Sequence, residues 1–151
     1  MSLPVAAKKP LKRRVGSTQI ITESQSLDFS CVTHIKIQKV LKQALTQLPA
    51  LTTVAVVDVA TGNCMAHFSR LRNFDSIAVA AHHAETVRQQ QQALAALHLR
   101  GERLEDILIS FRKQLTLLRL SKNGQWFVYL AVKAQDTSLA LAREVLKPIV
   151  A

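Results

Sequence analysis

Few residues of this 151-residue chain have the type and spacing that catalysis or metal binding requires. His82 and His83 are adjacent, so on a helix their side chains point about 100° apart and cannot bind one metal ion as an i, i+4 pair does. Cys31 and Cys64 form no Cys-x-x-Cys pair, and two cysteines fit a reduced compartment better than a disulfide framework. We therefore expect no metal site, and we interpret Cys64 as a small buried residue of a strand.

The acidic residues show no catalytic arrangement. Asp58 precedes a predicted turn, where its carboxylate would bond backbone groups. Glu102, Glu105 and Asp106 fall in a connecting segment among arginines, which is typical of a solvated cluster. The four glycines are widely spaced and form no phosphate-binding loop, and no Ser/His/Asp arrangement stands out. The sequence therefore predicts a binding protein, neither an enzyme nor dependent on a cofactor.

Positive charge dominates the composition. Twenty Lys and Arg stand against ten Asp and Glu, a formal net charge of +10. Residues 1–28 hold five basic residues, all within Lys8–Arg14, and two acidic ones, so most of the excess belongs to the remainder. Such a charge favours an acidic partner, and nucleic acid, an anionic surface and an acidic protein all satisfy it.

The composition divides the chain into a leader and one domain. Residues 1–28 mix Pro4, Pro10 and Gly16 with polar and basic residues and show no sustained period, which predicts a flexible basic arm. Residues 29–151 are predicted to form a single folded domain. No apolar run approaches the ~18 residues that span a bilayer, and no apolar stretch follows the basic cluster as in a secretory signal. We expect a cytoplasmic protein without a transmembrane segment.

Hydrophobic spacing predicts an α+β domain of three helices and five antiparallel strands. The helices run from Cys31 to Pro49, from Asp75 or Ser76 to about Leu97, and from a cap at Asp136 or Thr137 to Pro148. The strands are 52–59 and about 64–69, joined by a glycine turn, and three more from Arg103 onward, ending with 126–132. Because residues 126–132 are apolar on both faces, this strand is predicted to be central.

The helix predicted from Asp75 has a thin, alanine-rich apolar face. A helix buried in its own core usually carries larger apolar residues on that face. Small alanines with polar residues elsewhere suit packing against a helix of another protein. The predicted strand around Ile107–Phe111 also has an apolar face, and an edge strand of that kind favours a partner.

Several segments together resemble the Roadblock/dynein light chain superfamily. Thr53–Val59 with its glycine turn is similar to the family's first hairpin, and Leu104–Phe111 is similar to its third strand. Leu115–Leu120 and Trp126–Val132 resemble its closing hairpin. Ser138–Arg143 is similar to the Asn-Leu-Gly-Leu-Ala-Arg sequence that starts its last helix. The resemblance covers about residues 31–151 in the family's element order. It implies a Roadblock-like (profilin-like) layered fold of order α-β-β-α-β-β-β-α, with helices on both faces of a five-stranded antiparallel sheet.

The resemblance also implies a function. Relatives act as regulators or platforms for Ras-like small GTPases, or as adaptors on motors, and form homodimers in which third strands pair and long second helices pack. It therefore implies a non-enzymatic homodimeric regulator or scaffold for a small GTPase. The implied dimer or partner interface comprises Ala80, Ala84, Val87, Gln91, Leu94, Ile107, Ile109 and Phe111.

Three alternatives stay open at the level of sequence. The first is a nucleic-acid-associated protein that uses the basic arm with Arg70, Arg72, Arg112 and Arg119. The second is a small-ligand sensor built on a profilin-like sheet, which would need a ligand-sized cavity. The third places the implied interface residues in an ordinary monomer core.

Overall fold

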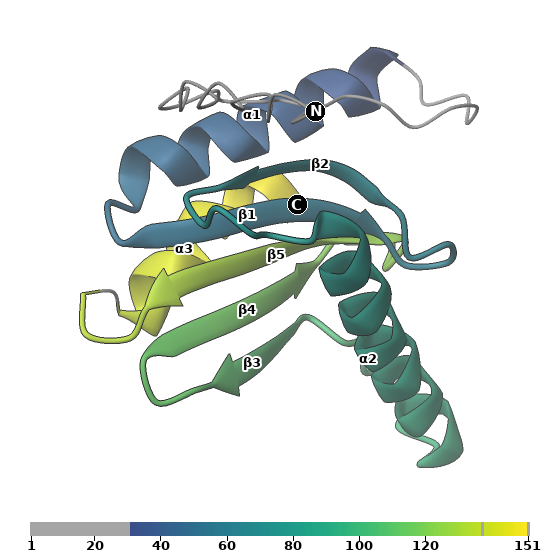
Figure 1. Cartoon of the computed structure of the whole chain (residues 1–151). Coiled ribbons are helices and arrows are strands. Elements are labelled where there is room, and N and C mark those ends of the chain that lie inside the picture. The colour runs from purple at the N-terminus through teal and green to yellow at the C-terminus, as the bar shows by residue number, and fades with distance from the viewer. Residues whose placement is uncertain (1–30, 137, 151) are drawn as a thin grey trace, which may run out of the picture.

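The computed structural model describes residues 31–136 and 138–150, which form one sheet with helices on both faces (Figure 1). The elements are α1 (Cys31–Gln47), β1 (Leu51–Asp58), β2 (Cys64–Ser69), α2 (Ser76–Ala96), β3 (Asp106–Ser110), β4 (Gln114–Leu120), β5 (Trp126–Lys133) and α3 (Leu139–Val150). The predicted order and fold class are confirmed. The predicted basic arm, residues 1–28, lies outside the described residues.

The sheet is antiparallel throughout, with strand order β2-β1-β5-β4-β3. β5 is the middle strand and is buried on both faces, as its uninterrupted apolar sequence predicts. β2 and β3 form the two edges. The register places the β2 end, the β3–β4 turn and the end of β5 at one end of the sheet.

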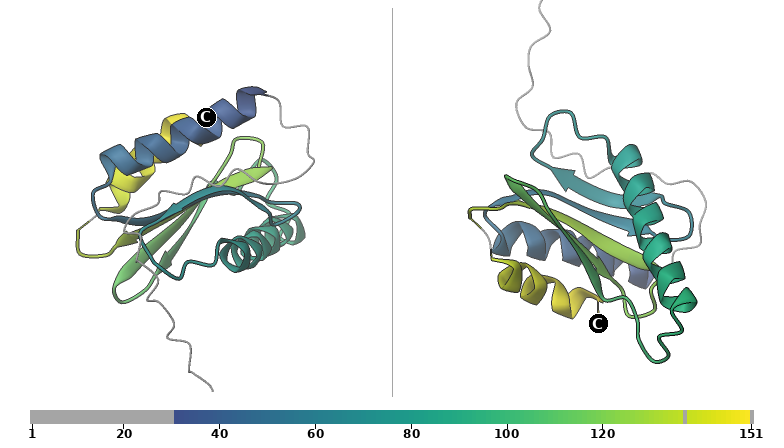
Figure 2. Two further views of the ribbon diagram at one scale, coloured as in Figure 1. Left: turned by 45° about the horizontal axis from the view of Figure 1, so that its top comes forward. Right: turned by 90° about the horizontal axis from the view of Figure 1, so that it is seen from below.

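Each face of the sheet has its own core. α1 and α3 lie side by side on one face, and α2 crosses the other (Figure 2). α1 buries Ile37, Val40, Leu41, Ala44 and Leu48 at helical spacing, which explains its position against the sheet. In the described part of the chain, none of the helices has the length and apolarity of a membrane span.

The last helix differs in detail from the sequence prediction. Its first-turn backbone is satisfied by Ser138, whose Oγ accepts from the Leu141 N–H at 3.1 Å, and not by Asp136; the other predicted cap, Thr137, lies outside the described residues. The helix also continues past Pro148 to Val150. A proline in the last turn removes a single backbone donor, so it weakens the helix end without terminating it at that residue.

Candidate functional site

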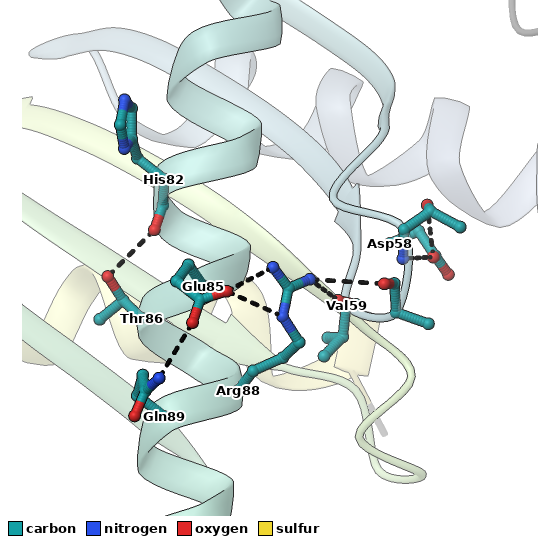
Figure 3. Close-up of polar contacts among 9 residues, drawn as sticks. Asp58, Val59, His82, Glu85, Thr86, Arg88 and Gln89 are labelled. Atoms are coloured by element: carbon teal, nitrogen blue, oxygen red, sulfur yellow. Dashed lines mark hydrogen bonds and ion pairs between the residues drawn. The ribbon is translucent and has the colours of Figure 1, made fainter.

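Arg88 fastens the middle of α2 to the turn between β1 and β2 (Figure 3). Its Nη1 donates to the Val59 carbonyl at 2.7 Å, and its Nε and Nη2 donate to Glu85 Oε2 at 3.2 and 2.7 Å. Glu85 also accepts from Gln89 Nε2 at 3.0 Å. The hydrogen bonds from Gln89 and then Arg88 lower the pKa of Glu85. The guanidinium is therefore occupied by contacts within the chain.

Asp58 stabilises the β1–β2 turn to which Arg88 is hydrogen-bonded, as the sequence predicts. Asp58 Oδ2 accepts from the Thr61 backbone N–H at 2.8 Å and from Thr61 Oγ1 at 2.7 Å (Figure 3). Gly62 follows with φ of 72°, in the left-handed region that favours glycine. A Cβ at Gly62 would lie 3.5 Å from Ala81 Cα and from Ala84 Cβ, so the turn packs directly on α2.

Three of the residues assigned to the interface on α2 lie in the core of the chain itself. Ala80, Ala84 and Val87 are buried against the α2-facing side of the sheet. The two alanines allow the helix to approach the strands closely, because they add little volume between them. Their side chains therefore cannot face a partner of the folded protomer. The alanine pattern therefore marks the side of α2 that packs on the sheet. A partner can contact only the opposite, exposed side of the helix.

The C-terminal end of α2 extends beyond Arg88 and Gln91, the residues that hydrogen-bond the helix to the turns of the sheet. Gln91 Nε2 donates to the Gly124 carbonyl at 3.3 Å, which holds the helix to the β4–β5 turn. Leu94 is half-buried. The remaining turns project past the sheet (Figure 1), and Leu97, the residue that caps the helix, is 68% exposed. Leu99 is also exposed, so this projecting end presents apolar surface.

We define the α2 outer face by its exposed residues. They are Ile77, Ala81, His82, Glu85, Gln89, Gln90, Gln92, Ala95 and Ala96. Its one formal charge, on Glu85, is paired with Arg88. Ile77 is 79% exposed in the first turn, where Asp75 caps the helix by accepting from the Ile77 and Ala78 N–H groups. The face is thus nearly neutral, with one large apolar side chain at its start.

β3 is a short edge strand with apolar residues on both faces. Within the described chain it pairs only with β4, so its outer edge carries backbone donors and acceptors without ladder partners. Ile107 and Ile109 face the α2 side and are half-buried, whereas Leu108 faces the α1–α3 side and is exposed. Phe111, just past the strand, is 55% exposed.

Of the acidic cluster that the sequence predicts to be solvated, Glu102 and Glu105 are exposed as expected, but Asp106, the first residue of β3, is not. The Asp106 side chain is only 13% exposed and contacts Arg119 at 2.8 Å and Arg143 at 2.9 Å. It therefore joins β3 to β4 and α3. Arg119, one of the arginines considered for nucleic acid, is largely buried and committed to this network.

A cleft of about 770 Å³ lies between the end of α2, the segment leading into β3, and α3. Leu94, Leu99 and Leu104 supply its apolar lining, and three arginines and three acids supply the charges. Because Asp106 holds two of those arginines, much of the polar lining is already paired. This cleft meets the size requirement of a small-ligand sensor, but its charged groups mainly serve the fold.

The pKa values of His83 and Cys64 are shifted by burial. His83 of α2 lies against Tyr129 of β5 with ring centroids 4.9 Å apart. Burial, and to a smaller extent the charge of His82, lowers the pKa of His83. Burial also raises the pKa of Cys64 to about 11, so its thiol stays protonated at neutral pH, as expected of a structural cysteine.

The described residues show no cluster of side chains that could bind a metal ion. Among residues 31–136 and 138–150, no three His, Cys, Asp or Glu side chains are grouped to hold a metal ion. Three exposed surfaces are apolar or nearly neutral: the α2 outer face, the projecting end of α2 and the β3 edge. Such surfaces suit protein contacts.

Comparison with known proteins identifies the fold. No protein-family model and no curated protein sequence matches the chain. Among solved structures, MglB of Myxococcus xanthus aligns with a TM-score of 0.66 at 15% identity, over 77% of this chain and 89% of MglB. An MglB with a tetrameric arrangement gives 0.65 at 15% identity, over 85% and 91%. A Roadblock/LC7 domain from Streptomyces avermitilis gives 0.61 at 11% identity, over 74% and 89%.

These structures define the class of the domain: it has the Roadblock/LC7-type fold. The resemblance found in the sequence is thereby confirmed at the level of fold. The likeness lies in the order and packing of the elements, since identity is at most 15% for these three structures.

Proposed function

We propose that this protein is a non-enzymatic, homodimeric regulator or scaffold for a Ras-like small GTPase. The observation that carries the proposal is the open β3 edge together with the projecting, apolar end of α2, on a Roadblock-type fold. A strand edge and a helix end that both expose apolar residues favour association with a second protein. The family resemblance in the sequence supplies the GTPase as the partner class.

The proposed dimer is formed by antiparallel pairing of β3 with β3 of a second copy. This pairing satisfies the outer edge of β3 and buries Leu108 and Phe111 near the two-fold axis. Leu97 and Leu99 at the end of α2 would pack in the same interface. The tetrameric arrangement of one similar MglB structure supports self-association of this fold. Of the interface first assigned from sequence, Leu94, Ile109 and Phe111 fit this dimer best.

The α2 outer face is the proposed contact for the GTPase. In a β3-paired dimer the two-fold axis is perpendicular to the sheet, so both α2 helices lie on the same side. They would form one broad platform, nearly neutral and with Ile77 exposed in each copy.

The dimer is tested by sedimentation velocity at micromolar concentration. We expect the wild-type chain to sediment as a dimer and the double variant Leu108→Asp/Phe111→Asp as a monomer, because two carboxylates would be buried at the pairing edge. Leu71→Asp is the control for placing a carboxylate at an exposed apolar position, since Leu71 is 52% exposed but follows β2 at the opposite edge. A wild-type monomer, or equal dissociation by Leu71→Asp, would contradict the proposed dimer.

The partner class is tested by a nuclease-treated pull-down from native lysate, with bound proteins identified by mass spectrometry. We expect recovery of a small GTPase that depends on its nucleotide state and is lost with Ile77→Asp. Leu141→Asp, an exposed leucine on α3 across the sheet, should retain it. Loss of all partners after nuclease treatment would instead favour nucleic acid as the ligand of the basic residues.

A further inference from the structure

The charge of the described residues is distributed unevenly between the two faces of the molecule. α1 contains Lys36, Lys39 and Lys42 and no acidic residue along its whole length. All three lysines are exposed: Lys39 and Lys42 lie on the side of the helix opposite the residues that it buries, and Lys36 lies at the boundary of the buried side. Spacing of three residues places them in one row along the helix surface.

α3 lies beside α1 and does not cancel this charge (Figure 2). Its acid, Glu144, lies 4.0 Å from Lys147, and its Arg143 is neutralised by Asp106. On the other side of the sheet, the charge of α2 is balanced by the Glu85–Arg88 pair. The outer side of α1 and α3, the α1–α3 layer, is therefore more basic than α2 on the other side of the sheet.

An apolar side chain stands among the lysines. Ile35 is 61% exposed and lies four residues before Lys39, on the same side of α1. A row of lysines around an exposed isoleucine is complementary to a surface that has negatively charged groups on the outside and an apolar layer directly below them. Lysine ammonium groups remain at the level of lipid phosphates while an apolar neighbour enters the interface.

We propose that the α1–α3 layer docks on a bilayer containing anionic phospholipids, through Lys36, Lys39, Lys42 and Ile35. A phosphodiester backbone would satisfy the lysines but offers no apolar surface for Ile35, and the row contains no arginine fork or aromatic ring for base contacts. Lysine point charges suit the diffuse attraction of a charged membrane surface.

The sequence before α1 adds charge of the same sign. Lys8–Arg14 holds five basic residues and is joined to the start of α1 by residues 15–30. In sequence these basic residues would add to the attraction of an anionic membrane, because each basic residue near the surface contributes roughly 1 kcal/mol. This inference goes beyond the proposed GTPase function and requires neither the dimer nor that partner.

Vesicle flotation with the full-length, nuclease-treated protein tests the inference. The vesicles contain phosphatidylcholine alone or with 30% phosphatidylserine, at ~100 mM salt. The test variant is Lys36→Ala/Lys39→Ala/Lys42→Ala. The control variant, Lys113→Ala/Lys122→Ala/Lys133→Ala, removes the same charge from exposed lysines at the ends of the sheet. Circular dichroism confirms that both remain folded.

We expect binding to the phosphatidylserine vesicles alone, released by raising the salt. Each lysine at the surface is worth roughly fivefold in the partition coefficient, so the α1 variant should bind roughly 100-fold more weakly. The control should lose less than about fivefold, and Ile35→Ser should weaken binding without changing the charge. Absence of binding by the wild type, equal loss in both lysine variants, or tighter α1-dependent binding to a DNA duplex than to vesicles would overturn the inference.

Discussion

Arg88 makes contacts that a shorter or neutral side chain cannot replace. Its loss would leave the Val59 carbonyl without a charged donor and release α2 from the β1–β2 turn. We expect Arg88→Ala to lower the free energy of unfolding by about 1.5–3 kcal/mol, the usual range for hydrogen bonds to charged groups. Urea denaturation of the wild type and the variant measures this change in the free energy of unfolding. Arg100→Ala, at an exposed position, is the control and should change stability by less than about 0.5 kcal/mol.

His83 makes stability depend on pH. Because burial lowers its pKa below the ordinary value of 6.5, the unfolded state binds a proton more readily than the folded state. The free energy of unfolding should therefore fall as pH drops through 6.5 and on through the lower folded-state pKa.

Urea midpoints at pH 7.5 and 5.5 test this dependence. The difference between the two midpoints should shrink in His83→Gln and persist in His98→Gln, since His98 is exposed. Some dependence should remain in both variants, because burial also lowers the pKa of His67. An unchanged difference in His83→Gln would show that burial of His83 does not hold the imidazole neutral.

At the scale of the element, α2 depends on small side chains where it meets the sheet. Ala84 is fully buried beside Gly62, so a larger residue would force helix and turn apart. We expect Ala84→Leu to cost about 1–3 kcal/mol of stability. Ala96→Leu, at an exposed position of the same helix, should stay within about 0.5 kcal/mol. Equal effects in thermal or urea unfolding would contradict the packing described for α2.

The elements could be predicted from the sequence because each carries a local signal. β-branched runs and glycine turns specified the hairpins, and the apolar residues 126–132 specified the central strand. The inner side of α2 could not be assigned in the same way. Alanine at positions 80 and 84 is compatible with packing on the chain's own sheet or on another helix, and only the tertiary structure distinguishes these.

Contacts between segments that lie far apart in the chain could not be predicted from the sequence either. Asp106 and Arg143 are 37 positions apart, and nothing local indicates that they pair. Asp106 therefore looked like one member of a solvated cluster. The β3 edge was predictable as an apolar strand, but its two different faces became apparent only from its register with β4.

At the scale of the whole molecule, the two faces of the sheet carry different chemistry. The α2 face is nearly neutral and exposes Ile77, whereas the α1–α3 layer is basic. A two-fold axis perpendicular to the sheet keeps the faces separate in the proposed dimer: both α2 helices lie on one side and both α1 helices on the other. A dimer docked on a membrane through α1 would leave the GTPase platform turned toward solvent.

This arrangement couples dimerisation to membrane binding. A dimer presents two lysine rows to one surface, and the second row binds at a high effective concentration once the first is docked. We therefore expect Leu108→Asp/Phe111→Asp, although it leaves α1 intact, to bind phosphatidylserine vesicles at least roughly tenfold more weakly than the wild type. Dilution of the wild type below its dimer dissociation constant should produce the same loss.

Leu71→Asp/Ile77→Asp adds the same two negative charges at exposed positions away from β3, so it should stay dimeric and bind the vesicles as the wild type does. Flotation across a concentration series, paired with sedimentation of the same samples, gives both quantities together. Equal vesicle affinity of monomer and dimer would mean that the two α1–α3 layers of the dimer do not face the same membrane surface. If they did, the two lysine rows would bind together and the dimer would bind more tightly. In that case the β3-paired geometry would be wrong even if a dimer forms, since antiparallel pairing at this edge places both layers on the same side of the joined sheet.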